Sequence, residues 1–336
     1  MRKSSKKPAR LQNVHADHVR AVALSNSAAA ESPLAASWAR SFKHYGLIPE
    51  LRRPKHRITA ARLRVCRESL GGMLRISAPI MDRLNASVGL SGCSVFLCDS
   101  NGIVLDQRTP LSDDHCFRDA GLWSGAVWSE ASEGTNGIGT CIAEKRSVTV
   151  YQNQHFHDSN TIMSCMGAPI FDENGRLAAV LDVSSCRADM TPSMAQMISQ
   201  LVTEGARQIE ADHFHSVFAG KRILRGSMDG RRGAVLLAVD GDDLVIGATR
   251  GARKCFGLTR EIMASPRPVG DILGDSCQRG VGLEYAEKRE VRRAIARTKG
   301  NMALAAKALG ISRATLYRRI ERLGLSRSYR NPSQNL

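Results

Sequence analysis

The chain has 336 residues, of which 43% are apolar and 24% charged, and its 48 Lys and Arg against 32 Asp and Glu give a formal net charge of +16. This length and apolar content exclude disorder of the whole chain and provide for two or three domains of about 100–200 residues. The basic balance favours an anionic partner such as nucleic acid or a membrane surface, although scattered charge would serve only solubility. The position of the basic residues along the chain decides whether the charge indicates an anionic partner or serves only solubility.

The sequence predicts no segment that crosses a membrane. Its longest apolar runs hold about six to eight residues, as at 234–239, against the ~20 that span a bilayer. The basic first residues are not followed by the apolar stretch of a signal peptide. We therefore expect a cytoplasmic protein with no membrane partner.

The Cys and His residues give no firm metal or catalytic pattern. Nine Cys are dispersed without a C-x-x-C pair, so we expect reduced, buried thiols. His155 and His157 would share one face of a strand, but the sequence fixes no third metal ligand. No nucleophile, base and orienting group stand out together. The sequence accordingly predicts no catalytic residue, no metal and no cofactor.

The N-terminal part divides by composition. Residues 1–36 are basic and then rich in Ala and Ser, which gives little to pack and suggests a mobile arm or a weak helix. Order is expected from Ser37, with an N-terminal helical region at 37–69. The many basic side chains of that region favour a solvated helix face over a phosphate contact.

Residues 70–192 are predicted to form an α+β domain, in which helices cover an antiparallel sheet. Two hairpins carry this prediction, at 94–105 and 168–183. Each turn contains Asn-Gly, which supplies the positive φ angles of a tight turn. The second hairpin is strongly apolar, so we expect it at the centre of the sheet.

A connecting helix and a smaller domain are expected next. Apolar residues spaced three and four apart predict a helix at 193–225. Two interpretations stay open: the helix closes the sheet domain, or it dimerises and passes strain to the next domain. A hairpin at 234–248 opens a small α+β domain at 230–274, and the Gly-rich stretch 275–284 is expected to be a linker.

The last part of the chain concentrates the positive charge. From Glu284 onward it holds 13 Lys and Arg against four Glu, an excess of nine out of the net +16. Three short helices are predicted within 285–326, over about 285–298, 302–309 and the remainder, with a tail at 327–336.

Capping residues bound these predicted helices. Gly300 and Gly310 can end the first two helices in a left-handed conformation. Asn301 and Ser312 can cap the second and third helices, and Leu304 is expected on an inner face. Small side chains at the corner let the helices approach, which predicts a helix-turn-helix whose third helix enters the major groove of double-stranded DNA.

The exposed face of the third helix holds the predicted DNA contacts. Arg313 has the fork geometry that binds guanine, and Arg318 and Arg319 suit phosphates. The complete predicted set is Ser312, Arg313, Ala314, Thr315, Tyr317, Arg318 and Arg319. A basic helical hairpin with no DNA role is the alternative.

Several segments resemble a known family. Residues 301–325 resemble the Fis-type helix-turn-helix that ends many bacterial enhancer-binding regulators. Residues 37–47, 125–140 and 160–183 are similar to the acetoin-catabolism (AcoR-type) branch of the sigma-54-dependent Fis family. This resemblance implies a GAF-like sensory domain at 70–192 and a degenerate PAS-like fold for the small domain after it.

One departure limits what the resemblance implies. Sigma-54 activators of this family place an AAA+ ATPase before the helix-turn-helix, whereas this sequence contains no G-x-x-x-x-G-K-[ST] loop and no GAFTGA segment. We therefore expect a regulator without ATPase activity that acts through DNA occupancy, recruitment or competition. RNA polymerase and full-length relatives are candidate partners. The alternative is an antagonist that forms mixed dimers with full-length activators or competes for their sites.

Two further expectations concern the dimer and the effector. One short module reads few base pairs, so we expect a homodimer on an inverted repeat. A small-molecule effector, or a redox signal, would act in the GAF-like domain. Its predicted contacts are Trp123, Trp128, Thr135, Asn136 and His155. The alternative is that Asn and Gly serve only the turn there, and Trp only the core.

Overall fold

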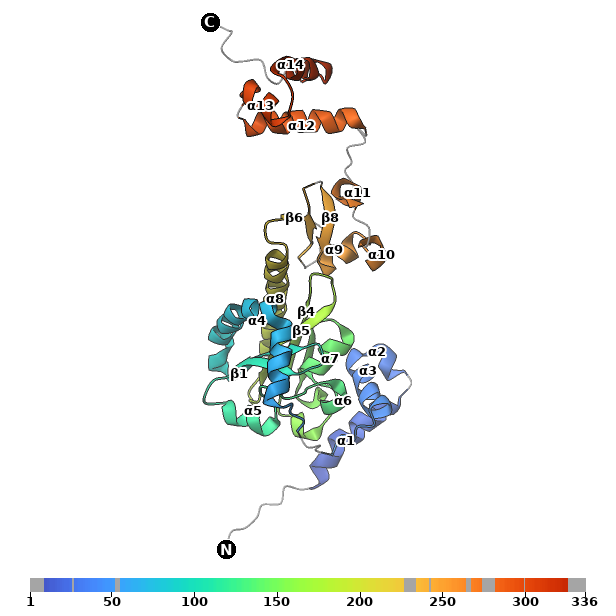
Figure 1. The fold of residues 1–336 in the computed structure, drawn as a ribbon. Coiled ribbons are helices and arrows are strands. Elements are labelled where there is room, and N and C mark those ends of the chain that lie inside the picture. Colours follow the sequence, from blue (N-terminus) through green and yellow to red (C-terminus); the bar gives the residue numbers. More distant parts are fainter. Residues whose placement is uncertain are drawn as a thin grey trace. The chain divides into compact units, whose positions relative to one another are not determined.

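The computed structural model divides into two compact units, Met1–Val269 and Gly270–Leu336, and each is described by itself (Figure 1). The residues that the structure describes are 9–25, 27–51, 55–226, 234–241, 243–263, 267–273, 282–298 and 300–325. The tail expected at 327–336 and most of the linker expected at 275–284 lie outside them. No helix in the described part of the chain is both long and apolar enough to cross a bilayer.

A five-stranded antiparallel sheet forms the centre of the first unit. Its strands are β1 (Cys93–Asp99), β2 (Val104–Arg108), β3 (Val148–Tyr151), β4 (Ser164–Phe171) and β5 (Leu177–Ser185). They lie in the order β2-β1-β5-β4-β3, so both predicted hairpins are confirmed and the apolar one is central. Strand β5 is flanked on both sides and is buried along nearly its whole length.

The two hairpin turns use a carboxylate and one glycine. The Asp99 carboxylate accepts hydrogen bonds from the backbone N–H of Asn101 (2.9 Å) and Ile103 (2.8 Å). Gly102 has a φ of +81°, whereas Asn101 does not have a positive φ. The turn of the second hairpin repeats this arrangement around Asp172, with Gly175 at +73°. Only the glycine of each Asn-Gly pair therefore needs the left-handed region.

Two long helices cover one face of the sheet. They are α4 (Ala60–Val88) and α8 (Pro192–Val217), which lie side by side in Figure 1. The core between them and the sheet includes Met81 on α4, Leu181 on β5 and Val202 on α8, each at most 1% exposed. Burial of such side chains contributes about 1.5–3 kcal/mol each. The connecting helix thus closes the sheet domain, as one of the two interpretations required.

Shorter helices cover the opposite face. They are α5 (Asp114–Ala120), α6 (Glu130–Glu133) and α7 (Gly137–Glu144). Phe96, Trp128 and Cys165 are among the buried side chains of this second core. The first α+β domain therefore has an apolar layer on each side of its sheet, which explains the unbroken burial of its central strands.

The described part of the N-terminal arm is helical, in line with the second of the two alternatives that its composition suggested. From Ala9 the chain forms α1 (Ala9–Leu24), α2 (Ala28–Glu31) and α3 (Pro33–Ala39), followed by a π-helical turn at Arg40–His44. Val19 and Ala23 of α1 are fully buried and pack in one cluster with Trp38 and Phe156. Small side chains pack here because they let α1 lie close to its neighbours, so the Ala-rich segment is part of the folded unit.

One expected boundary falls inside a helix. The division between the helical region at 37–69 and the following domain lies within α4, which continues through it with a kink at Gly71 (φ +39°). Glycine permits this angle at no steric cost. The helical region and the sheet domain are therefore joined without a linker.

A second, four-stranded sheet follows α8. Its strands are β6 (Arg222–Arg225), β7 (Leu236–Val239), β8 (Leu244–Ala248) and β9 (Arg267–Pro268), in that order, with α9 (Arg250–Cys255) and α10 (Arg260–Met263) beside them. Helix α11 (Val269–Leu273) follows β9 along the chain. The predicted hairpin is confirmed as β7 and β8. Strand β6 lies in the segment assigned to the connecting helix, which ends at Val217. Phe214 near the end of α8 packs with Leu236 and Ala238, so α8 contributes to both sheet cores.

The second unit contains the three predicted C-terminal helices. They are α12 (Leu283–Arg297), α13 (Met302–Ala308) and α14 (Arg313–Arg322). Their shared core includes Ile295, Ala305 and Leu316, each at most 1% exposed. Leu304 is 53% exposed, which corrects the expectation that it faces inward.

Candidate DNA-recognition helix and sensory interior

Local capping sets the bounds of α13 and α14. The Asn301 side chain accepts hydrogen bonds from the N–H of Ala303 (3.1 Å) and Leu304 (3.2 Å). The Ser312 hydroxyl accepts one from the N–H of Thr315 (3.1 Å). Both caps satisfy backbone donors that a helix leaves free at its start. Gly310, at a φ of +66°, makes the corner between the two helices.

The first turn of α14 presents polar side chains to solvent. Leu316 and Ile320 hold one face of the helix in the core, and the predicted contacts lie around the rest. Arg313 and Tyr317 are exposed and adjacent, with the guanidinium carbon 5.6 Å from the ring centroid. Arg318 is exposed as well, and Thr315 is half-buried. An exposed Arg in the first turn of such a helix is placed as a base-reading side chain requires.

Arg319 has a different environment from the other predicted contacts. Its Nη1 lies 3.0 Å from Oε1 of Glu287 on α12, and Arg322 also contacts that carboxylate. Two arginines of α14 are therefore tied to α12 through one side chain. The helical spacing placed Arg319 on the solvent side, but nothing in the sequence identified Glu287 as its partner.

Two predicted effector contacts stabilise a turn. Asn136 is the N-cap of α7, where its Oδ1 accepts from the N–H of Ile138 (2.9 Å) and Gly139 (2.8 Å). The Thr135 hydroxyl lies 2.7 Å from the hydroxyl of Ser37. Both residues are 0% exposed. Their polar atoms are engaged by the protein, as the turn interpretation expected.

The two tryptophans have unequal surroundings. Trp128 is buried, and its indole N–H donates to the carbonyl of Gly121 (2.9 Å). Trp123 is half-buried, and the guanidinium carbons of Arg57 (4.8 Å) and Arg118 (4.4 Å) both lie close to its ring centroid. Trp128 thus belongs to the core, whereas the ring of Trp123 is covered by cations.

His155 is a buried, neutral histidine. Its Nδ1 lies 2.9 Å from the carbonyl of Gln152, and its Nε2 lies 3.3 Å from Sγ of Cys165. Burial lowers the pKa of His155 to about 4, against the opposing effect of the Gln152 hydrogen bond. Burial also raises the pKa of the Cys165 thiol. Residues 155–157 lie between two 3-10 turns and not in a strand, so the shared face assumed for a metal pair does not form.

Two motifs that were identified separately meet in the structure. Arg40 binds the buried Glu130 through Nε and Nη2, both at 2.8 Å, and reaches Glu144 at 2.9 Å. The Ser37 hydroxyl donates to Glu130 at 2.5 Å. Hydrogen bonding to Glu130 raises the pKa of Arg40. The N-terminal helices are thereby joined to the turn at Thr135, which the sequence could not reveal.

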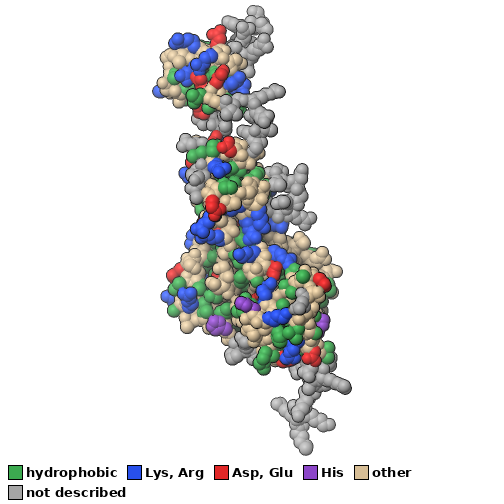
Figure 2. Space-filling view, turned by 90° about the vertical axis from the view of Figure 1, so that its right-hand side faces the viewer, with side chains coloured by type: hydrophobic (Ala, Val, Ile, Leu, Met, Phe, Trp, Pro, Cys, Tyr) green, Lys and Arg blue, Asp and Glu red, His purple; other side chains and the backbone are tan. Residues whose placement is uncertain are grey.

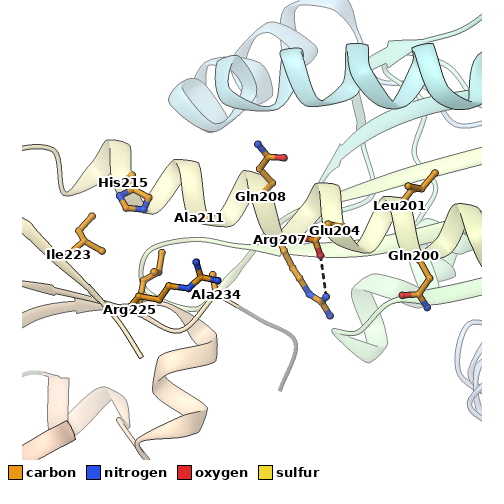
Figure 3. Close-up of a pocket in the computed structure, with 11 residues that line it drawn as sticks. Gln200, Leu201, Glu204, Arg207, Gln208, Ala211, His215, Ile223, Arg225 and Ala234 are labelled. Carbon is orange, nitrogen blue, oxygen red and sulfur yellow. Dashed lines mark hydrogen bonds and ion pairs between the residues drawn. The ribbon is translucent and has the colours of Figure 1, made fainter. Parts of the chain in front are cut away.

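A cavity in the described structure lies beside α8. Its volume is about 910 Å³ (Figure 3). It is lined by Gln200, Leu201, Glu204, Arg207, Gln208, Ala211, His215, Ile223, Arg225, Ala234 and Leu236. None of the five predicted effector contacts lines it. In Figure 3, Arg207 and Glu204 project from α8 and form an ion pair, with Nη1 and Oε2 3.5 Å apart.

Comparison with known proteins agrees with this architecture. Residues 73–209 match the GAF domain family, and residues 282–323 match the family described as "Bacterial regulatory protein, Fis family". The chain carries a GAF domain and a Fis-family helix-turn-helix. The matched segments coincide with the five-stranded sheet domain and with α12–α14, so the resemblance drawn from the sequence is confirmed.

Relatives of this chain include proteins named as transcriptional regulators. The acetoin catabolism regulatory protein of Cupriavidus necator is 33% identical over 178 residues, which cover 53% of this chain and 27% of the relative. The acetoin dehydrogenase operon transcriptional activator AcoR of Bacillus subtilis is 27% identical over 138 residues, 41% of this chain and 23% of the relative. The match thus spans about a quarter of the length of these relatives.

A solved structure of the Escherichia coli DhaR(N)–DhaL complex is also similar. Its matched chain is 19% identical, with a TM-score of 0.49, and the alignment covers 71% of the present chain and 81% of that chain.

Proposed function

We propose that this chain is a sequence-specific DNA-binding regulator whose GAF domain senses a small molecule or a redox signal. The observation that carries the proposal is the capped α14, whose first turn presents polar side chains while its apolar stripe is held in the core. The relatives regulate transcription. The protein would work in the cytoplasm, without a catalytic step of its own.

The proposed DNA contacts divide into two kinds. Arg313 reads guanine in the major groove, with Ser312, Ala314 and Thr315 beside it in the first turn. Tyr317 and Arg318 lie farther along the exposed face, where a phosphate contact fixes the register. Arg319 acts by holding α14 against Glu287, and its contact with phosphate is secondary.

The proposed mode of action uses no ATP. This sequence contains no G-x-x-x-x-G-K-[ST] loop, so binding would act through occupancy, recruitment or competition. A homodimer would pair two copies of α14 on an inverted repeat, because one helix reads only a few base pairs.

The test begins with selection of preferred duplexes from a random pool by the purified full chain. Its affinity for a selected site and for random duplex is then measured across a salt titration. We expect a selected inverted repeat that binds at least roughly 1,000-fold more tightly than random duplex. Equal affinities would contradict the proposal. Selection that succeeds only when a full-length relative is added would instead support the mixed-dimer antagonist.

A further inference from the structure

A second cavity lies where the GAF domain meets the second sheet. Its volume is about 280 Å³. The end of α7, the hairpin of β4, the middle of α8 and the start of α9 all contribute to its wall. The lining residues are Lys145, Arg146, Ser147, Ala168, Pro169, Phe171, Thr203, Ala206, Arg207, Glu210, Ala234, Arg250, Gly251 and Lys254. Arg207 and Ala234 also line the cavity of Figure 3, whereas the predicted DNA contacts and effector contacts include none of these residues.

The charge in this cavity is strongly unbalanced. Five cations line it, from three separate helices or their ends, against the single carboxylate of Glu210. Figure 2 shows Lys and Arg side chains gathered over this junction. In the described part of the chain no carboxylate lies within 4.0 Å of the charged atoms of Lys145, Arg250 or Lys254.

The remaining two cations are held only loosely by carboxylates outside the cavity. Arg146 lies 3.6 Å from Glu144, and Arg207 lies 3.5 Å from Glu204. Arg146 is half-exposed, so its pair is screened by water and contributes little. These long pairs leave the cavity with a net positive field, which attracts anions into a concave site.

Glu210 is occupied by the backbone. Its Oε1 accepts a hydrogen bond from the N–H of Phe171 at 2.8 Å, and burial raises the pKa of Glu210 to about 7. The guanidinium of Arg250 lies 3.7 Å from the centroid of the Phe171 ring, and burial lowers the pKa of Arg250. Arg250 is thus partly desolvated, and its charge lacks a carboxylate in direct contact among the described residues.

The Ser147 hydroxyl completes the donor set, because Thr203 donates its own hydroxyl hydrogen to Ser147. Thr203 on α8 and Ser147 after α7 both line the cavity, and their oxygens lie 3.0 Å apart. Hydroxyl, ammonium and guanidinium donors on one concave wall are the groups that bind phosphate and carboxylate oxygens.

We propose that this cavity binds a small polyanion, a phosphorylated metabolite or a polycarboxylate, between Lys145 of the GAF domain and Lys254 of α9. A cavity of this volume accommodates a small molecule and is too small to enclose a nucleic-acid duplex. Because its cations come from both sheet domains, the bound anion holds α9 against the end of β4. This inference goes beyond the DNA-binding function proposed above and does not depend on it.

Calorimetry on the full chain tests the proposal, with inorganic pyrophosphate and citrate as separate probes. Chloride at the same ionic strength is the reference for screening. We expect saturable binding of at least one probe, and binding of pyrophosphate alone or of citrate alone assigns the ligand to the phosphate or the carboxylate class. Lys145→Ala and Lys254→Ala should each weaken binding about tenfold or more, since each removes a hydrogen bond to a charged group. Both lysines are exposed, so their loss leaves the fold intact.

Two further variants sharpen the test. Glu210→Gln removes the competing negative charge while it keeps an oxygen for the Phe171 N–H, so the probe should bind more tightly. Arg64→Ala removes one exposed charge from α4 outside the cavity and should leave the affinity unchanged.

Three results would overturn the proposal. Neither probe binds beyond the chloride reference, or Arg64→Ala weakens binding as much as the lysine variants do. The third is binding of duplex DNA that Lys145→Ala and Lys254→Ala weaken, without binding of either small probe, which would make the region a nucleic-acid surface. The calorimetry with pyrophosphate and citrate contains no DNA. Each of these failures therefore leaves the role proposed for α14 intact.

Discussion

The helix-turn-helix and the GAF interior place similar polar residues in opposite situations. In the second unit, Arg313 and Tyr317 are exposed beside a capped helix start, and among the described residues their side chains make one polar contact, a long hydrogen bond with each other from Arg313 Nη2 to the Tyr317 hydroxyl at 3.5 Å. In the GAF domain, Thr135, Asn136 and His155 are fully buried, and the protein itself bonds their polar atoms. A polar residue in a distinctive motif therefore indicates a binding site only if its donors and acceptors are left unused.

Energetics explain why the buried set is so completely bonded. A buried polar group without a partner destabilises the fold by about 1–3 kcal/mol, and a charged one by more. A capping Asn or a paired Glu in the interior is thus required by the fold alone. No such requirement acts on an exposed arginine. This difference can be tested by substitution, from the largest expected effect to the smallest.

Arg40→Ala should have the largest effect on stability. Its loss would leave Glu130, which is 3% exposed, buried without its bidentate partner. Removal of one partner of a buried pair destabilises by about 3–5 kcal/mol. Chemical denaturation of the full chain measures the change. Arg64→Ala, an exposed control on α4, should alter stability by less than about 0.5 kcal/mol, and an equal loss in both variants would contradict the account.

Asp182→Asn should change the pH dependence of stability. Asp182 lies on β5 and is fully buried; its Oδ2 accepts from Ser184 (2.6 Å), and no described partner contacts its Oδ1. Burial raises the pKa of Asp182 to about 7, so the folded state binds more protons than the unfolded state between about pH 4 and pH 7. The contribution of Asp182 to the free energy of unfolding therefore falls as pH rises through that window, by up to about 1.4 kcal/mol per pH unit.

Asp182→Asn has no carboxyl group at this position, so its stability does not fall in this way as pH rises. Its stability relative to the native chain should rise from about pH 4 to pH 7 and remain level above pH 7, as followed by denaturation at each pH. Asp189→Asn, at a carboxylate that is 74% exposed, is the matched control. The account fails here if the stability difference for Asp182→Asn does not vary with pH.

Gly310→Ala tests the corner between α13 and α14. Gly310 has a φ of +66°, and a Cβ there would meet no atom within 4 Å, so the strain is purely in the backbone. An L-residue in this region is destabilised by about 1–2 kcal/mol, and Asn tolerates it better than Ala. In thermal unfolding of the C-terminal helices, the native chain should be the most stable, Gly310→Asn should come second, and Gly310→Ala should be the least stable. The reverse order would be inconsistent with a left-handed corner.

Ser312→Ala should have a smaller effect. It removes the hydroxyl that accepts from the Thr315 N–H, and loss of such a cap destabilises by about 1 kcal/mol. Ser312→Asp keeps an acceptor at the same position and should retain most of the stability. Thermal unfolding without DNA measures both variants, so that any role of Ser312 in DNA binding does not enter.

Local sequence signals predicted much of the fold. The Asp-x-Asn-Gly turns, the caps at Asn301 and Ser312, and the glycines after α12 and α13 each act within a few residues, so they can be read from the chain directly. The hairpin positions and the three C-terminal helices follow from them. Leu304 was misplaced because a short helix has few turns from which to define its inner face.

The contacts between distant segments could not be predicted in this way. Val19 packs with Phe156, Arg40 binds Glu130, and Arg319 binds Glu287, and in each pair only the folded chain brings the partners together. The protein partners of the predicted effector contacts Thr135, Asn136 and His155 could not be read from the sequence for the same reason. A turn rich in Gly and Asn has the same sequence whether its polar atoms face a cavity or the protein interior.

The most direct test of sequence reading by α14 compares Arg313→Ala with the native chain on a selected duplex and on random duplex, at one salt concentration. The quantity measured is the ratio of the two affinities. We expect this ratio to fall about 5- to 150-fold, which corresponds to the ~1–3 kcal/mol of a bidentate contact with guanine. A folded Arg313→Ala variant that keeps the native ratio would show that the exposed face of α14 does not read DNA sequence.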